Sequence, residues 1–332
     1  MAEIIDAAFV TSVYRVLLGR EPESDAIVRT WVNNAASRQD LLRSFVTSAE
    51  FAGANAGLLN ELQTKTAPPK TPSIASSPPL SIDWDVPPPL TARMLRRIEA
   101  VWQKLGETEP HWSVLSADRF RQANLGESRA QFDQSGAGET DMIAGVLRRQ
   151  GIDLAQFAHA VEYGAGVGRM TRHLAPRVKR LTALDISASH LALAEAWLEA
   201  NGVGNATCLR VADAETFGMT EPFDFWFSRI VLQHNPPPVM AQILRRAFAM
   251  LKPGGMALFQ LPTYAKGYAF HAEDYLAEAP GGAAIEMHCL PQSAVFALAA
   301  AAGCVALEVR EDNATGHPSV FISNLFLFRK AA

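Results

Sequence analysis

Val-Glu-Tyr-Gly-Ala-Gly-Val-Gly-Arg-Met-Thr, residues 161–171, is the stretch from which the fold of this chain can be read. Glycine occupies every second position from Gly164 to Gly168. Glycine lets a backbone turn sharply out of a strand and leaves no Cβ between the backbone and a ligand, while the first turn of the next helix offers free N–H groups. The stretch therefore predicts a strand, a ligand-binding turn and a helix start, and hence a cofactor-dependent enzyme.

The sequence from residue 139 onward alternates between helix and strand patterns, which is typical of a parallel sheet covered on both faces. Residues 312–318 join the last two expected strands and are too few for a crossover helix, so these strands should be antiparallel. The predicted fold class is α/β, a Rossmann-like seven-stranded sheet with an antiparallel last hairpin. The expected strands are 159–163, 180–185, 206–211, 223–228, 256–261, 304–311 and 320–329, and the expected helices are 140–150, 169–175, 188–201, 238–251 and 291–302.

The preceding sequence predicts a small all-α domain, because apolar residues at helical spacing (Phe9, Val13, Val16 and Leu17) precede Gly19, a helix terminator. Ser37 with Asp40 has the form of a second helix start. Prolines crowd residues 65–89, which indicates an extended linker. The apolar spacing from Met94 to Leu105 predicts one further helix, and residues 107–138 are expected to be irregular. The predicted domains are a helical bundle (1–64), a Pro-rich linker (65–89), a helical and irregular lid-like extension (90–138) and a catalytic domain (139–332).

The composition narrows the choice of partners and compartment. The formal net charge of −4 provides no whole-chain attraction for nucleic acid or anionic membranes. No apolar run is long enough to cross a bilayer, and the N-terminus lacks the basic segment of a signal peptide. The three cysteines and the remaining potential ligands have no metal-site spacing, so we expect a cytoplasmic protein with metal-independent chemistry.

The residues around the glycine turn limit the cofactor. Arg169 stands where a nicotinamide fingerprint requires its third glycine, and no Gly-Lys-Ser/Thr follows as in a Walker loop. Glu162 would repel a pyrophosphate and favours a cationic or zwitterionic ligand. Asp185, at the second strand end, can accept hydrogen bonds from both ribose hydroxyls, and Asp213, after the third strand, can accept one from the exocyclic amine of a base. Taken singly, Asp185 could be a helix cap and Asp213 a turn residue, but their joint placement favours binding.

The G-x-G-x-G turn and these three carboxylates, with Phe-Asp-Phe-Trp-Phe-Ser (223–228) and Leu-Lys-Pro-Gly-Gly-Met (251–256), resemble class I S-adenosylmethionine-dependent methyltransferases over residues 139–330. The resemblance implies that Glu162 lies near the methionine amino group, the glycines under methionine and ribose, and Asp185 at the ribose hydroxyls. It places Ile186 against the adenine, Asp213 at the adenine amine and the Ala214 N–H at a ring nitrogen. The implied cofactor residues are Glu162, Tyr163, Gly164, Ala165, Gly166, Gly168, Asp185, Ile186, Asp213, Ala214, Ser228 and Arg229.

The first segment resembles a family of short helical domains of unknown function that are related to phycobilisome linker repeats and occur on bacterial glycan-processing enzymes. The resemblance is carried by residues 9–22, Phe-Val-Thr-Ser-Val-Tyr-Arg-Val-Leu-Leu-Gly-Arg-Glu-Pro, and by Ser-Ala-Glu-Phe at 48–51. Family members usually have a longer middle section. The resemblance implies no enzymatic role, and we expect this domain to mediate assembly with a protein partner.

Methyl transfer to a hydroxyl requires a positioned acceptor and a base. His234, after the fourth strand, is the first candidate, although it could instead orient its loop or cap the next helix. The long segment 263–290 is expected to form the acceptor pocket, with His271 and His288 as alternative bases. The sequence thus favours an O-methyltransferase acting on a sugar or glycan. Alternatives are a cofactor-binding scaffold without transfer activity and a small-molecule or N-methyltransferase, whereas Arg169 and Glu162 disfavour a nicotinamide dehydrogenase.

Overall fold

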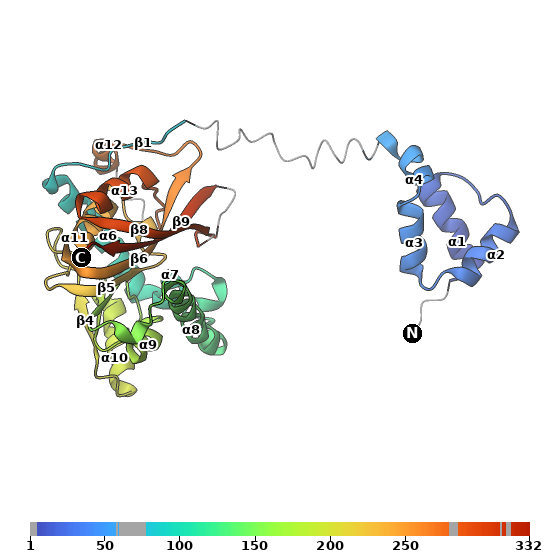
Figure 1. Ribbon diagram of the computed structural model, residues 1–332. Helices are drawn as coiled ribbons and strands as arrows, with labels where there is room; N and C mark the ends of the chain where they lie inside the picture. Colours follow the sequence, from blue (N-terminus) through green and yellow to red (C-terminus); the bar gives the residue numbers. More distant parts are fainter. Residues whose placement is uncertain (1–4, 58, 60–77, 279–284, 313, 317–319) are drawn as a thin grey trace. The chain divides into compact units, whose positions relative to one another are not determined.

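The computed structural model describes residues 5–57, 59, 78–278, 285–312, 314–316 and 320–332. They belong to two compact units, Met1–Ser77 and Pro78–Ala332, which are considered separately (Figure 1). The first part of the predicted linker, up to residue 77, lies outside the described residues. No helix in the described ranges has the length and the apolar character that a bilayer crossing requires.

The first unit is helical, as its sequence predicts. Its elements are α1 (Ala7–Val13), a π-helix (Tyr14–Leu18), α2 (Asp25–Asn34), α3 (Arg38–Val46) and α4 (Ala49–Ala54). Gly19 ends the π-helix with φ at +66°, and the Ser37 hydroxyl accepts a hydrogen bond from the Asp40 N–H at 3.1 Å, so both predicted helix boundaries are confirmed. Val16 was expected in the core and is 77% exposed. The wider turn of the π-helix changes the helical phase, so Tyr14 is buried instead.

The second unit contains a seven-stranded sheet in the order β4-β3-β2-β5-β6-β9-β8 (Figure 1). Strand β9 is antiparallel to both of its neighbours, β6 and β8, so the predicted α/β fold with an antiparallel last hairpin is confirmed. The strands are β2 (Ala160–Tyr163), β3 (Leu181–Asp185), β4 (Ala206–Arg210), β5 (Phe223–Ser228), β6 (Leu251–Ala265), β8 (Cys304–Asp312) and β9 (Phe321–Lys330).

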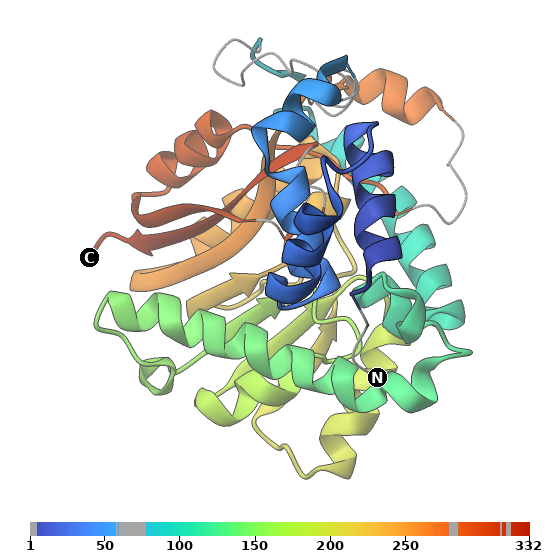
Figure 2. The ribbon, with the colours of Figure 1, turned by 90° about the vertical axis from the view of Figure 1, so that its right-hand side faces the viewer.

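The central strands alternate their side chains between two apolar cores. Trp226, Phe259 and Phe326 belong to a core with α6 (Pro88–Thr108), α11 (Pro237–Met250) and α13 (Gln292–Ala301). Their neighbours Phe227 and Leu258 belong to the opposite core, which includes α8 (Leu125–Arg149) and α9 (Thr171–Leu174). In Figure 2 the long green helix α8 runs along the sheet. Helix α10 (Ala188–Ala200) packs on β3 and on the end of α6. Strands buried on both faces explain the almost uninterrupted apolar sequence of this region.

Two segments differ from the sequence predictions. Residues 107–138 are largely helical: they contain the end of α6, α7 (Pro110–Val114), a 3₁₀ turn at Asp118–Phe120 and the first half of α8. The second part of the predicted linker is also folded. Its strand β1 (Ser81–Ile82) pairs in parallel with β7 (Ala269–Phe270), which precedes α12 (Ala272–Ala277), and α6 begins at Pro88. Both segments therefore cover the sheet and its carboxyl-terminal edge.

The sheet order also fixes where a ligand can bind. From β2 the chain runs to β3 and β4 on one side and later returns to β5 on the other side of β2. The helices that follow β2 and β5 therefore diverge, which leaves a crevice at the carboxyl ends of these two strands.

Candidate active site

A cavity occupies this crevice and encloses about 880 Å³ of space, its open mouth included. The glycine turn after β2, the ends of β3 and β5, and helices α6 and α7 form its walls. Its lining includes Ile98, Trp102, Ser113, Val114, Glu162, Tyr163, Gly164, Ala165, Gly166, Arg169, Asp185, Ile186, His190, Arg229, Ile230, Val231, His234 and Asn235. Eight of the twelve cofactor residues implied by the sequence (Glu162, Tyr163, Gly164, Ala165, Gly166, Asp185, Ile186 and Arg229) line this cavity.

The glycines of the turn are required by its backbone. Gly164, Gly166 and Gly168 have φ values of +84°, +55° and +75°, a left-handed conformation that is costly for residues with a side chain. A Cβ on Gly164 would lie 2.2 Å from Cγ2 of Val231, and one on Gly168 would lie 3.0 Å from Cβ of Ala194. The glycines thus bring the turn close both to β5 and to α10.

Asp185 is fixed at the mouth of the turn. Its Oδ2 accepts a hydrogen bond from the Gly166 N–H at 2.7 Å, and its Oδ1 accepts one from the Ser187 N–H at 2.9 Å. Each carboxylate oxygen can accept a second hydrogen bond, and the side chain is half-buried against the cavity. Asp185 therefore has both the position and the acceptor capacity to bind a pair of ribose hydroxyls.

Glu162 is a buried carboxyl group at the inner wall of the cavity. Thr171 donates a hydrogen bond to its Oε2 at 2.7 Å, and the side chain is 3% exposed. Burial raises the pKa of Glu162 to about 7, because the charged form loses hydration. A bound cation would favour the charged form, so the site suits a ligand that carries an ammonium group.

Arg169, whose position in the sequence disfavours a nicotinamide cofactor, also lines the cavity. Its side chain is 5% exposed, and one N–H nitrogen donates to the Ser135 hydroxyl at 3.2 Å. Its Nε has no hydrogen-bond partner among the described residues. A buried guanidinium with an unused donor suits an anionic ligand group, such as a carboxylate. An arginine directly after a G-x-G-x-G turn was the sequence signal for this role.

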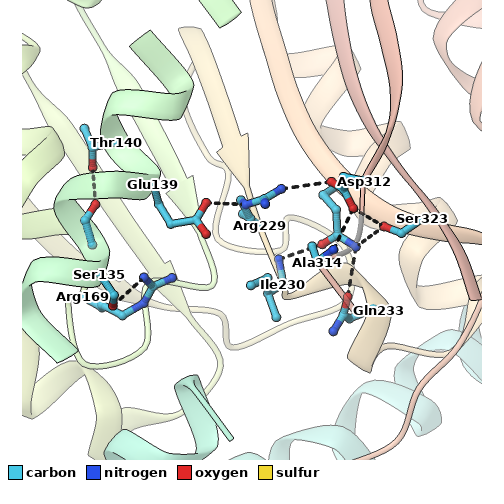
Figure 3. A network of polar contacts seen from close by, with 12 residues as sticks. Ser135, Glu139, Thr140, Arg169, Arg229, Ile230, Gln233, Asp312, Ala314 and Ser323 are labelled. Carbon is cyan, nitrogen blue, oxygen red and sulfur yellow. Dashed lines mark hydrogen bonds and ion pairs between the residues drawn. The ribbon is translucent and has the colours of Figure 1, made fainter. Parts of the chain in front are cut away.

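Arg229 lines the cavity and lies between Glu139 and Asp312, as Figure 3 shows. It donates to Glu139 of α8 at 2.5 Å and to Asp312, the last residue of β8, at 3.1 Å. Asp312 in turn accepts hydrogen bonds from the Ser323 hydroxyl at 2.8 Å and from the Ala314 N–H at 3.0 Å. This network ties the final hairpin and α8 to the end of β5.

Ile230, the next residue, has φ at +57°, which is unfavourable for a β-branched side chain. Its N–H donates to the side-chain carbonyl of Gln260 at 3.0 Å, while the Gln260 amide nitrogen donates to Gln233 at 3.0 Å and to Ser323 at 2.8 Å. The buried Gln260 side chain thus holds the strained backbone in place, directly at the cavity wall.

His234 lies in the 3₁₀ turn Leu232–His234 and lines the cavity. Its Nδ1 lies 2.8 Å from the Glu286 carbonyl oxygen, which can only accept, so Nδ1 carries the proton. Its Nε2 is then an acceptor, 3.3 Å from the side-chain nitrogen of Gln233. Burial lowers the pKa of His234 to about 4, so the ring is neutral near pH 7.

The remaining predicted residues lie outside the cavity lining. His271 is exposed, with its Nδ1 3.6 Å from Asp83, whereas His288 is buried between Tyr268 and Glu286 at 2.8 and 3.1 Å.

Asp213 and Ala214 follow β4. The Asp213 carboxylate accepts from the N–H groups of Glu215 and Thr216 at 2.9 and 2.6 Å, a turn arrangement that lowers its pKa. Ser228 donates to the Tyr163 carbonyl at 3.0 Å, and Gly168 packs on α10. The roles of these residues toward a ligand stay predictions. Within the described ranges, no cluster of three His, Cys, Asp or Glu residues could hold a metal ion.

A known protein family matches the part of the chain that contains the glycine turn. Residues 160–255, from the first residue of β2 into the first part of β6, match a family described as a methyltransferase domain. The chain contains a methyltransferase domain. The matched residues include the glycine turn, Asp185 and His234.

The chain also has curated relatives. Ubiquinone biosynthesis O-methyltransferases from two strains of Pseudomonas fluorescens are 30% identical to this chain over 99 residues, which are 30% of this chain and 42% of theirs. The chain thus spans less than half the length of these relatives.

Two solved structures are also similar. One is an N-methyltransferase from Bradyrhizobium japonicum in complex with S-adenosylhomocysteine, with 18% identity, coverage of 70% of this chain and 99% of that chain, and a TM-score of 0.45. The other is the magnesium protoporphyrin IX methyltransferase from Synechocystis, also with S-adenosylhomocysteine bound, with 14% identity, coverage of 66% and 100%, and a TM-score of 0.45.

Proposed function

We propose that this chain is an S-adenosylmethionine-dependent methyltransferase that methylates a hydroxyl group of a sugar or glycan intermediate. The observation that carries the proposal is the meeting of the glycine turn, Asp185 and the unpartnered donor of Arg169 in one cavity within the matched methyltransferase domain. The bound cofactor supplies an electrophilic methyl group on its sulfonium. The residues of the chain bind and orient both reactants.

The cavity offers a complementary group for each polar part of the cofactor. Glu162 suits the ammonium group, Arg169 suits the carboxylate, and Asp185 accepts from the ribose hydroxyls. Glu162 and Asp185 thus provide hydrogen-bond acceptors for the two donor groups of the cofactor, its ammonium group and its ribose hydroxyls. Arg169 provides a donor for its carboxylate. The curated relatives named above act on oxygen, which favours a hydroxyl acceptor. The resemblance of residues 9–22 and 48–51 to domains on glycan-processing enzymes favours a sugar.

The test is isothermal titration with S-adenosylhomocysteine, followed by a screen of sugars and sugar phosphates with radiolabelled cofactor. We expect saturable binding at one site per chain and label transfer to at least one hydroxyl compound. Failure of the wild-type protein to bind S-adenosylhomocysteine would overturn the proposal.

The affinity for S-adenosylhomocysteine should depend on Glu162 and on pH. The pKa of Glu162 is raised to about 7, so the carboxyl group is mostly neutral at pH 6 and mostly charged at pH 8. If only the charged form binds the ammonium group, affinity should be roughly tenfold weaker at pH 6 than at pH 8. Titrations in buffers of different ionisation enthalpy should show proton release on binding near pH 7. Glu162→Gln should bind more weakly at pH 8 and lose this pH dependence; a variant that retains it would disprove the assignment.

His234 is the candidate base, and its replacement should affect turnover rather than cofactor binding. General-base catalysis typically contributes about 10²-fold or more to the rate, so His234→Ala should lower kcat at least about 100-fold, while its affinity for S-adenosylhomocysteine changes little. His271→Ala is the control, because this exposed side chain lies outside the cavity lining. Equal kcat values for wild type and His234→Ala would remove the ring from the mechanism.

The low pKa of His234 also favours one alternative, a scaffold that binds the cofactor without transferring its methyl group. A base with a pKa of about 4 is a weak proton acceptor near pH 7. Mass spectrometry of glycans from cells with and without the protein would distinguish the two functions. A methyl group that is present on a glycan from cells with the protein and absent from cells without it would support methyl transfer.

A further inference from the structure

Helix α6 lines three hollows in succession, from the cofactor cavity toward the surface. Ile98, Trp102 and His234 line both the cofactor cavity and a second hollow of about 260 Å³. Arg97 lines this second hollow and also a third, outer one between α6 and the end of α12. Because neighbouring hollows share lining residues, the three lie in series along α6 between the surface and the cofactor cavity.

The outer hollow is cationic. Arg93, Arg96 and Arg97 line it together with Leu276 and Glu278. The three arginines stand three and four residues apart, so they share one face of α6. Three guanidinium groups meet two carboxylates, because Glu286 also lies 3.5 Å from Arg97, which leaves an excess of one positive charge beside Arg93 and Arg96.

Arg97 is held rigidly at the inner end of this hollow. It donates to the carbonyl oxygens of Tyr275 at 2.6 Å and of Glu278 at 3.0 Å, and it stacks on the Tyr275 ring at 4.2 Å. Its Nη2 lies 3.5 Å from a carboxylate oxygen of Glu286, and its buried Nε has no hydrogen-bond partner among the described residues. This guanidinium is therefore pre-positioned and still has an unused donor.

The side chains of Arg93 and Arg96 are less constrained by contacts than that of Arg97. Both side chains are exposed, and neither forms an ion pair with a carboxylate in the described ranges. Their donors are thus available to a ligand that arrives from solvent. Exposed arginines have many rotamers, so a bound anion would have to compensate for the ordering of two side chains.

We propose that this outer hollow binds a phosphate or diphosphate group of the methyl acceptor, so that the acceptor extends through the second hollow toward His234. The proposal rests on the function proposed above, and it narrows the acceptor to a phosphorylated or diphosphate-linked hydroxyl compound. A phosphate monoester carries about two negative charges near neutral pH, and its three terminal oxygens match the paired donors of two guanidinium groups. A carboxylate offers only two oxygens and one charge to the exposed donors of Arg93 and Arg96.

The test uses inorganic pyrophosphate as the probe, titrated at low salt into the full chain saturated with S-adenosylhomocysteine. We expect saturable binding that the double substitution Arg93→Gln/Arg96→Gln weakens by about tenfold or more, because two charge-assisted contacts are lost. Arg148→Gln is the matched control, since Arg148 is another exposed helical arginine, on α8 and outside the outer hollow. Its affinity for pyrophosphate should equal that of the wild type.

The outcomes separate this inference from the proposed function. All variants should bind S-adenosylhomocysteine like the wild type and unfold at the same temperature, because Arg93 and Arg96 lie outside the cofactor cavity. If the cofactor product binds but pyrophosphate does not, or binds the double variant equally well, the inference is wrong and the proposed function stands. Tighter binding of malonate than of pyrophosphate would likewise overturn the choice of phosphate. Failure of S-adenosylhomocysteine itself to bind would instead overturn the proposed function.

Discussion

Gly164→Ala is expected to abolish binding of S-adenosylhomocysteine and to destabilise the second unit. The left-handed conformation at φ +84° costs alanine about 1–2 kcal/mol. The new Cβ would also lie 2.2, 2.5 and 2.8 Å from Cγ2, Cγ1 and Cβ of Val231. Rotation of the valine side chain cannot remove the contact with its Cβ, so the turn must move away from β5. Overpacking of this kind adds about 1–3 kcal/mol, and the displaced turn narrows the cavity.

The matched control is Gly151→Ala. Gly151 has a similar φ of +72°, but a Cβ there would have no neighbour within 4 Å. This variant should lose only about 1 kcal/mol in the free energy of unfolding and should bind S-adenosylhomocysteine normally. Chemical denaturation and isothermal titration measure the two effects. If the two alanine variants behave alike, the close approach of the turn to Val231 has no role in the site.

Asp185→Ala should weaken S-adenosylhomocysteine binding at least about 100-fold, which corresponds to about 3 kcal/mol. The substitution removes the proposed acceptor for the ribose hydroxyls, and it also removes the partner of the Gly166 and Ser187 N–H groups that shape the turn. A lost charge-assisted hydrogen bond typically costs about 1.5–3 kcal/mol, so two affected contacts account for the expected size. Isothermal titration with S-adenosylhomocysteine measures it.

Asp213→Ala provides the comparison among the predicted carboxylates. Asp213 is exposed, its Oδ1 already accepts from the N–H groups of Glu215 and Thr216, and its Oδ2 accepts from the Thr216 hydroxyl, so its removal should affect the local turn more than the ligand. We expect a loss of affinity less than about tenfold. Full-affinity binding by Asp185→Ala would disprove the ribose assignment, whereas a loss in Asp213→Ala as large as that expected for Asp185→Ala would support the predicted contact with the adenine amine.

The core of the fold could be predicted from the sequence because its signals are local. Each strand of the central sheet is an apolar run bounded by turn residues, and the short connection at 312–318 fixes the antiparallel hairpin. Helix α8 escaped prediction in its first half for a definite reason: Gly136 and Thr140 occupy two of its buried positions and interrupt the apolar spacing. A Cβ on Gly136 would lie 2.0 Å from the Arg169 carbonyl oxygen, so packing against the turn after β2 imposes this glycine.

The sequence predicts those residues of the site that lie at or next to the end of a strand with a clear sequence pattern. Glu162, Asp185 and the glycine turn follow from that rule, and of these residues Glu162, Asp185, Gly164 and Gly166 line the cavity. The partners of these residues come from distant segments that carry no pattern of their own. Ser135, which binds Arg169, and the Glu286 carbonyl, which fixes the protonation of His234, are examples. Their contribution depends on tertiary packing, which a single sequence does not reveal.

The short pairing of β1 with β7 determines at which residue a recombinant fragment of the second unit should begin. Beyond the two paired residues, the Asp83 N–H donates to the Phe270 carbonyl at 2.9 Å, and the Asp83 carboxylate accepts from the Ala272 N–H at 3.0 Å. Trp84 packs on the core shared with α6 and α11. A recombinant fragment that starts at residue 90, as the proline content alone would suggest, would lack these contacts and the first turn of α6. A fragment that starts at Pro78 keeps these contacts and the whole of α6.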